Sequence, residues 1–183
     1  MEAHKLKTFA DLEEALEKEE RLELINGEII RRPMARFEHG EVQGNLREEL
    51  GEIRRIGSGG GWWFATEVNV RYNEHNAPCH DIAGWRKDRV KQKPSGVVDI
   101  LPDWVCEISS PGHIAKDTVS ILNMLQTHKV PWYWIIHPEE KALTVYQYVD
   151  DAYKVIAAIQ NQSKVRLEPF TEIEFDLNFI FEE

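Results

Sequence analysis

The sequence predicts an α+β fold (mixed α/β), in which a mixed β-sheet is flanked by helices. Helical periodicity near the N-terminus and again at 114–129 alternates with short aromatic and β-branched runs. Two nearly continuous apolar runs, 103–109 and 132–137, bracket the second helical stretch. An apolar strand, a helix and another apolar strand in succession indicate a right-handed crossover between parallel strands. The segment 103–137 is therefore expected at the centre of the sheet.

The N-terminal part predicts a helix, a hairpin and a second helix. The stretch 8–20 begins with Thr8, followed three residues later by Asp11, which is the pattern of a helix capping box. Asn26-Gly27 separates two short alternating runs in 21–32 and predicts a two-residue hairpin turn. Apolar side chains at helical spacing predict a helix over 37–56.

The rest of the chain predicts strands around one further helix. We expect strands at 62–72 and 80–85, an irregular region at 86–101, and strands at 103–109 and 132–137 around the helix 114–129. Asp150-Asp151 lies between two alternating runs and predicts a second hairpin, and 172–177 predicts a last strand.

Composition favours one soluble globular domain spanning residues 1–183. Hydrophobic residues make up 42% and charged residues 30% of the chain, and no apolar run approaches the roughly 20 residues of a membrane span. The N-terminal residues 1–20 are charged and lack the apolar core of a signal peptide. The two cysteines, Cys79 and Cys106, are expected to be buried free thiols in a reducing cytoplasm.

The net charge of −10 argues against passive nucleic-acid binding, because contacts to phosphate need Lys and Arg. It leaves room for an enzyme with a local basic surface, or for one that brings a divalent metal to the phosphate. The densest basic stretch is 86–93. It is either a solvated loop or a surface that faces DNA.

Carboxylates in or beside apolar strands are the candidates for chemistry. Glu107 lies within the apolar run 103–109, where an unpaired carboxylate is costly to bury. Strand alternation places Val105, Glu107 and Ser109 on one face and Trp104, Cys106 and Ile108 on the other.

Asp81 begins a neighbouring strand, so Asp81 and Glu107 could hold one divalent ion between them. Oxygen ligands suit Mg²⁺ or Mn²⁺, and such an ion can activate water and stabilise charge on a phosphate. The alternative for Asp81 is a strand-capping residue. Asp103 shares the face of Glu107 but lies at the start of the strand, where Pro-Asp is a common junction.

Five blocks in order resemble the Uma-two family of restriction-endonuclease-like proteins, within the PD-(D/E)XK nuclease superfamily. They are "LELINGEII", "HDIAGWRKDRV", "PDWVCEISSP", "KVPWYWIIHPEEKALTVYQY" and "EPFTEIEFDL", and the resemblance runs from about residue 7 to 182. It implies a restriction-endonuclease-like core. It also implies that Asp81, here preceded by His80 where the family has proline, and Glu107 are the metal ligands, with Asp103 outside the site.

The resemblance also suggests further site residues. The superfamily's Glu-X-Lys pattern would place its lysine at residue 109, which is Ser109 in this chain. Family members often carry it on the following helix, one turn beyond an aspartate, but the residue four positions after Asp117 is Ile121. Lys116, at the start of the helix, is the candidate that could reach back toward Glu107. Glu23 matches a family glutamate near the metal centre, with a solvent-facing strand acid as the alternative. His39 could orient a water or phosphate, or be structural, and Gln43 follows it on the same helix face.

Three functions remain open at this level. The first is a Mg²⁺- or Mn²⁺-dependent DNA endonuclease, the second a nuclease-fold protein without catalysis that binds DNA or a protein partner, and the third a hydrolase of small phosphate compounds. A homodimer is expected, because cutting two strands suits paired sites and because four tryptophans give the strands much aromatic surface. These are Trp62, Trp63, Trp132 and Trp134.

Overall fold

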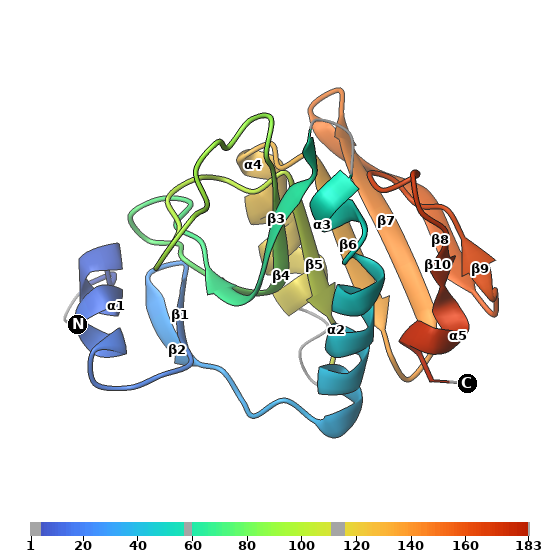
Figure 1. Ribbon diagram of the computed structural model, residues 1–183. Coiled ribbons are helices and arrows are strands. Elements are labelled where there is room, and N and C mark those ends of the chain that lie inside the picture. Colours follow the sequence, from blue (N-terminus) through green and yellow to red (C-terminus); the bar gives the residue numbers. More distant parts are fainter. Residues whose placement is uncertain (1–4, 57–59, 111–115, 183) are drawn as a thin grey trace.

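A six-stranded mixed sheet forms the centre of the molecule in a computed structural model of the chain (Figure 1). The structure describes residues 5–56, 60–110 and 116–182, except for the side chains of residues 56 and 116–118. Along the sheet the order follows the chain: β3 (Trp62–Asn69), β4 (Cys79–Arg86), β5 (Trp104–Ile108), β6 (Trp132–His137), β7 (Ala142–Val149) and β8 (Ala152–Gln160). Only β5 and β6 run parallel, as the crossover predicted, and the other neighbours are antiparallel.

A helix and a hairpin precede the sheet, as the sequence predicts. Helix α1 (Phe9–Leu16) begins at Thr8, and the capping box with Asp11 is formed. The hairpin pairs β1 (Leu22–Ile25) with β2 (Glu28–Arg31). Its turn needs Gly27, because the backbone there has φ +76° and a Cβ atom would lie 2.8 Å from the Leu6 side chain.

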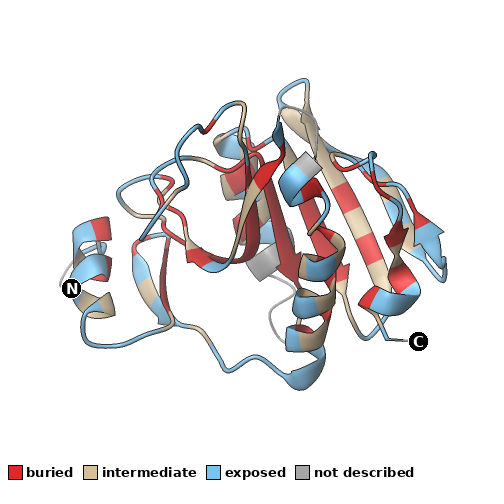
Figure 2. Ribbon diagram, in the orientation of Figure 1, coloured by how far each residue is buried: buried red, intermediate tan, exposed pale blue. Residues whose placement is uncertain are grey.

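The helix predicted over 37–56 is divided into α2 (Phe37–Glu49) and α3 (Ile53–Ile56). The break follows Leu50, which caps α2, and includes Gly51, where a Cβ atom would lie 2.9 Å from the Glu48 carbonyl oxygen. The apolar face of α2 covers one side of the sheet (Figure 2). It packs in the same core cluster as the inner side chains of β5, which are Trp104, Cys106 and Ile108.

The opposite face of the sheet is covered by the crossover helix. Residues 114 and 115 of the helix predicted over 114–129 lie outside the described residues, and the described part forms a π-helical segment, η2 (Lys116–Ile121), followed by α4 (Leu122–Thr127). Ile121 and Leu125 lie in the same core cluster as Val105. Trp104, Cys106 and Ile108 lie in the cluster on the other side of β5, in agreement with the predicted alternation. The residues of β5 are buried on both faces, which confirms its central place.

The C-terminal segment closes over the α2 side of the sheet. The strand predicted over 172–177 is reduced to β10 (Phe175–Asp176), which pairs with β9 (Lys164–Val165). Asp176 ends it, because its side chain accepts hydrogen bonds from the first amides of α5 (Leu177–Ile180). Phe170 packs edge-on against Trp62 and Trp134, with ring centroids 5.0 and 5.6 Å apart. These two tryptophans are therefore core residues, while Trp63 and Trp132 are half-buried.

Both cysteines are buried free thiols, as predicted. Within the described residues, no helix has the length and apolar character that crossing a membrane requires.

Candidate functional site

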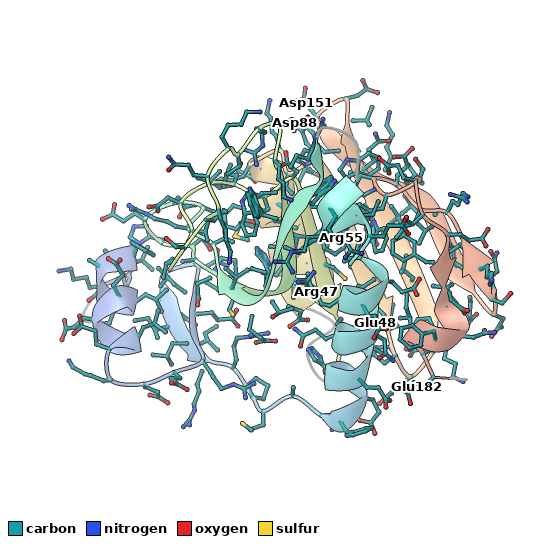
Figure 3. The ribbon with its side chains drawn as sticks, viewed as in Figure 1. Arg47, Glu48, Arg55, Asp88, Asp151 and Glu182 are labelled. Carbon is teal, nitrogen blue, oxygen red and sulfur yellow. The ribbon has the colours of Figure 1, made fainter. Side chains whose placement is uncertain are left out.

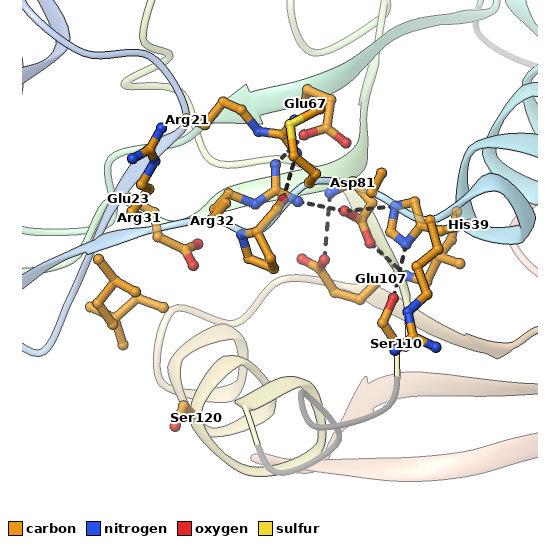
Figure 4. A pocket seen from close by; sticks show the side chains of 17 residues that line it. Arg21, Glu23, Arg31, Arg32, His39, Glu67, Asp81, Glu107, Ser110 and Ser120 are labelled. Atoms are coloured by element: carbon orange, nitrogen blue, oxygen red, sulfur yellow. Dashed lines mark hydrogen bonds and ion pairs between the residues drawn. The ribbon is translucent and has the colours of Figure 1, made fainter.

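A cavity of about 630 Å³ lies between the N-terminal hairpin, the first turn of α2 and the strands β4 and β5 (Figure 4). Its wall contains five of the residues that carry the chemistry, which are Glu23, His39, Glu67, Asp81 and Glu107. The same wall contains four arginines, which are Arg21, Arg31, Arg32 and Arg36. The cavity therefore combines a buried acidic centre with a basic rim.

Asp81 is the centre of this arrangement. Its Oδ2 atom accepts a hydrogen bond of 2.7 Å from the Ile108 amide of the neighbouring strand. Its Oδ1 atom lies 2.6 Å from Arg32 Nη2 and 3.5 Å from His39 Nε2. Burial raises the pKa of Asp81, but contacts with His39, Arg32 and the Ile108 amide outweigh burial and hold the pKa below its usual value. Asp81 is therefore an ionised carboxylate although it is buried.

Glu107 lines the same cavity, as the sequence predicts, and a histidine holds it. One carboxylate oxygen lies 2.5 Å from His80 Nδ1, and the other accepts a hydrogen bond of 3.4 Å from the Asp81 amide. The second ring nitrogen of His80 lies 2.9 Å from the Tyr72 hydroxyl. His80 is fully buried, so the residue that replaces the expected proline fixes the orientation of Glu107.

Asp103 lies outside the cavity, as predicted. Its carboxylate accepts hydrogen bonds of 2.8 Å from the Arg86 amide and from Arg89 Nε. These contacts tie the start of β5 to the loop after β4. Asp103 therefore has a structural role at the start of β5.

Glu67 is a site residue that the sequence analysis missed. It lies opposite Asp81, since Thr66 pairs with Ile82 and Val68 pairs with His80. Its backbone has φ +50° in the middle of β3, a conformation that is costly for glutamate and that often marks functional positions. In the sequence Glu67 resembles an outward-facing residue of a half-buried strand, and nothing in the local pattern distinguishes it.

Arg32 is the second residue that sequence reasoning missed. Its guanidinium forms ion pairs with both Asp81 and Glu67 and lies 3.1 Å from Cys79 Sγ. Burial disfavours its charge, but the neighbouring acidic groups raise the pKa of Arg32 well above its usual value. Burial also raises the pKa of Cys79 to about 12, so the thiol is neutral at pH 7 and the two carboxylates balance the guanidinium.

Helix α2 contributes His39 and Gln43, which lie one turn apart and both reach Asp81. Gln43 Nε2 donates to the Asp81 carbonyl oxygen at 2.8 Å and to Glu67 at 3.0 Å. Burial lowers the pKa of His39, but Asp81 outweighs this and raises it. Ligand atoms of His39, Glu67 and Asp81 all lie within 4.8 Å of one another, which is close enough to bind one metal ion.

Glu23 and Lys116 complete the set of predicted site residues. Glu23 is buried on β1, lines the cavity and accepts a hydrogen bond of 3.2 Å from the Cys79 amide. It is therefore not a solvent-facing strand acid. Lys116 begins η2, but its side chain lies outside the described residues. Ser109 is buried, and Ile121 is a core residue, so neither position offers a cation.

Comparisons with known proteins identify the family and the fold of this chain. The sequence matches the Uma2 family, described as "Putative restriction endonuclease", over residues 6–179. No curated protein matches significantly. A crystal structure of "a putative nuclease belonging to DUF820 from Anabaena variabilis" matches with a TM-score of 0.75 and 20% identity, over 93% of this chain and 97% of that chain. This likeness confirms the predicted fold, and the family match extends over nearly the whole sequence. The chain therefore belongs to the Uma2 family.

Proposed function

We propose that the chain is a divalent-metal-dependent nuclease that hydrolyses phosphodiester bonds of DNA. The observation that carries the proposal is the convergence of His39, Glu67 and Asp81 within 4.8 Å at a cavity rimmed by arginines. The acidic residues at the centre would bind the metal cation, and the arginines around them would bind the negatively charged phosphate. Membership in a family described as "Putative restriction endonuclease" supports DNA as the substrate.

The donor set fits a divalent cation. Two carboxylates and an imidazole offer oxygen and nitrogen ligands, while His80 holds Glu107 in place beside them. Carboxylates suit both Mg²⁺ and Mn²⁺, and the imidazole favours Mn²⁺ because Mg²⁺ prefers oxygen ligands alone. When bound, such an ion polarises the phosphate and lowers the pKa of a water ligand.

The residues of the chain would hold the metal ion and bind the phosphate. Asp81 and Glu67 hold negative charge at the centre, and Glu107, fixed by His80, adds a third carboxylate to the wall. Arg32 supplies a positive charge beside these groups, where it can pair with a phosphate oxygen in a bidentate manner. Lys116 remains the proposed lysine that stabilises charge developing on the scissile phosphate.

A second candidate function is nucleic-acid binding without catalysis. Its support is Ile121, which is packed in the core at a position where members of the family often carry the lysine. Under this alternative the acidic centre is held together by Arg32 and needs no metal. The two functions differ in whether the chain binds a divalent ion and whether it cuts DNA.

The test combines calorimetric titration of Mn²⁺ and Mg²⁺ with plasmid nicking, on the wild type and on Asp81→Asn. Asparagine keeps the shape of the side chain, and Asp103→Asn is the matched control because it removes a buried acid outside the cavity. We expect the wild type and Asp103→Asn to bind Mn²⁺ and nick DNA, and Asp81→Asn to do neither while remaining folded by circular dichroism. If the wild type binds no divalent ion, the proposal of a metal-dependent nuclease is wrong, and nucleic-acid binding without catalysis is favoured.

A further inference from the structure

A second cavity, of about 370 Å³, lies along β3, which is an edge strand of the sheet. Its wall is formed by residues of α2, α3 and β3 and by the loop segment 93–98. Glu67 lines this cavity and the acidic one described above. The two cavities therefore meet at a residue of the proposed metal centre.

Four cations gather at the second cavity. Arg47, Arg54 and Lys93 line it, and Lys87 lies beside it, with Nζ 2.7 Å from the Arg54 carbonyl oxygen. Among the described residues, no carboxylate lies within ion-pair distance of Arg47, Arg54 or Lys93. This is unexpected in a chain with net charge −10, where acidic residues outnumber basic ones. Unpaired cations around one hollow form a site for an anion.

Arg47 shows most clearly that a partner is missing from the free protein. It projects from α2 toward β3 (Figure 3), and its guanidinium lies 5.4 Å from the centre of the Phe64 ring. Its Nη1 atom is buried and has no hydrogen-bond partner among the described residues. Burial and the charge of Arg54 lower the pKa of Arg47. A buried N–H donor without a hydrogen-bond partner is costly, and so is the repulsion between Arg47 and Arg54. A bound anion would accept a hydrogen bond from Arg47 and offset this repulsion.

Aromatic rings of β3 hold two of these cations in place. Lys87 Nζ lies 4.6 Å from the centre of the Trp63 ring, and the Arg47 guanidinium lies over the neighbouring Phe64 ring at 5.4 Å. The Trp63 ring is itself fixed by a hydrogen bond of 2.9 Å from Nε1 to the Val90 carbonyl oxygen. Arg47 and Lys87 are therefore held against rings of the strand that also carries Glu67, rather than being freely moving surface groups.

We propose that the second cavity binds a backbone phosphate of a nucleic-acid strand whose neighbouring phosphate lies in the acidic cavity. The identification of the anion as nucleic acid rests on the proposed function, because the shared residue Glu67 connects the cavity to the proposed cutting site. The binding itself needs neither metal nor cleavage. A strand following β3 past Glu67 meets Arg47, Arg54 and Lys93 in the second cavity.

The test is fluorescence anisotropy with a labelled single-stranded oligodeoxythymidine in EDTA, at several salt concentrations. The variants are Arg54→Gln and Lys93→Gln, and the matched controls are Arg55→Gln and Lys91→Gln, which remove exposed charges nearby that do not line the cavity. We expect each cavity variant to weaken binding several-fold. Each should also reduce the slope of log K against log salt by about 0.7, the value for one phosphate contact on a single strand. The controls should leave both quantities unchanged.

Three results would overturn the inference. One is a wild type that does not bind the oligonucleotide. Another is an equal loss of affinity in cavity variants and controls, which would mean that general charge and not the cavity attracts the strand. The third is displacement of the oligonucleotide by inorganic phosphate at equal concentration, which would identify a site for free phosphate. Plasmid nicking with Mn²⁺ is scored separately, so failure of the nuclease proposal and failure of this binding site are distinguishable.

Arg47 allows an independent check. Arg47→Met removes an unpartnered buried charge and keeps apolar contact with Phe64, so we expect the melting temperature to stay level or rise while affinity for the oligonucleotide falls. A lower melting temperature with unchanged affinity for the oligonucleotide would show that Arg47 stabilises the fold by packing and does not contact the nucleic acid.

Discussion

Arg32→Met should make the metal-free chain less stable and at the same time a tighter binder of Mn²⁺. The guanidinium occupies the position between Asp81 and Glu67 where a cation would bind, and its side chain is only 11% exposed. Arginine and metal ion therefore compete for the Asp81 carboxylate. Methionine has a similar length without the charge, so it removes the competitor with little change in packing.

The size of the destabilisation follows from the burial of Asp81. Removing one partner of a buried ion pair costs about 3–5 kcal/mol, because the other charge is left uncompensated. We expect about 3 kcal/mol, the lower end of this range. Asp81 keeps His39 and the Ile108 amide, and the Glu67 side chain is 42% exposed and can be solvated.

The gain in metal affinity follows from the same ion pair. In the wild type, part of the binding free energy is used to separate Arg32 from Asp81. If this amounts to about 1.4–2.8 kcal/mol, the dissociation constant for Mn²⁺ falls about 10- to 100-fold in the variant. Added Mn²⁺ should then raise the unfolding free energy of the variant more than that of the wild type, since binding to the native state stabilises it by mass action.

The assay is urea unfolding with and without Mn²⁺, together with calorimetric titration. Arg31→Met is the matched control, because it removes a charge from the same wall, where Arg31 pairs with Glu19 and is exposed. Equal stabilisation by Mn²⁺ in the wild type and Arg32→Met would refute competition for Asp81. If Arg31→Met also binds Mn²⁺ more tightly than the wild type, the effect comes from the lower positive charge of the wall and not from competition for Asp81.

Three further predictions concern catalysis, pH and assembly. Lys116→Ala should leave Mn²⁺ affinity nearly intact and reduce plasmid nicking about 100-fold or more, and unchanged nicking would exclude this lysine. The folded pKa of Cys79 is about 12 against a reference of 9.0, so the neutral thiol favours the fold and stability should fall as pH rises from 9 toward 12. Cys79→Ala should weaken that pH dependence in urea unfolding, and an identical profile would contradict the burial argument. Light scattering at micromolar concentration should give the mass of a homodimer, in which the half-buried Trp63 and Trp132 contact the partner subunit. A monomer mass would contradict this prediction.

Features encoded by local patterns were predicted well. The capping box at Thr8, the Asn26-Gly27 turn and the strand 132–137 depend on neighbours in sequence, and each is found where expected. Alternation around Glu107 also correctly separated Val105 from Trp104, Cys106 and Ile108. The break after Leu50 was missed, because apolar spacing continues across it while the backbone does not.

The site was predictable only in part, because its remaining members meet through long-range contacts. Asp81 and Glu107 are unusual in their own strands, and family resemblance also pointed to them. Arg32 follows a short exposed strand and pairs with a residue 49 positions away, which no local pattern indicates. Glu67 becomes distinctive only through its left-handed backbone conformation, and conformation of that kind is invisible in an alternating strand sequence.

Asp81 connects the parts of this molecule in a way that bears on its evolution. Its side chain joins the segment after β2, helix α2 and strand β5 through Arg32, His39 and the Ile108 amide, and its carbonyl oxygen accepts a hydrogen bond from Gln43. Selection for a folded protein therefore acts on this aspartate even without selection for cleavage. A descendant that lost its catalytic lysine would still retain the carboxylate. The presence of this aspartate in a chain is therefore no evidence of cleavage, and activity has to be judged from residues that the fold does not need.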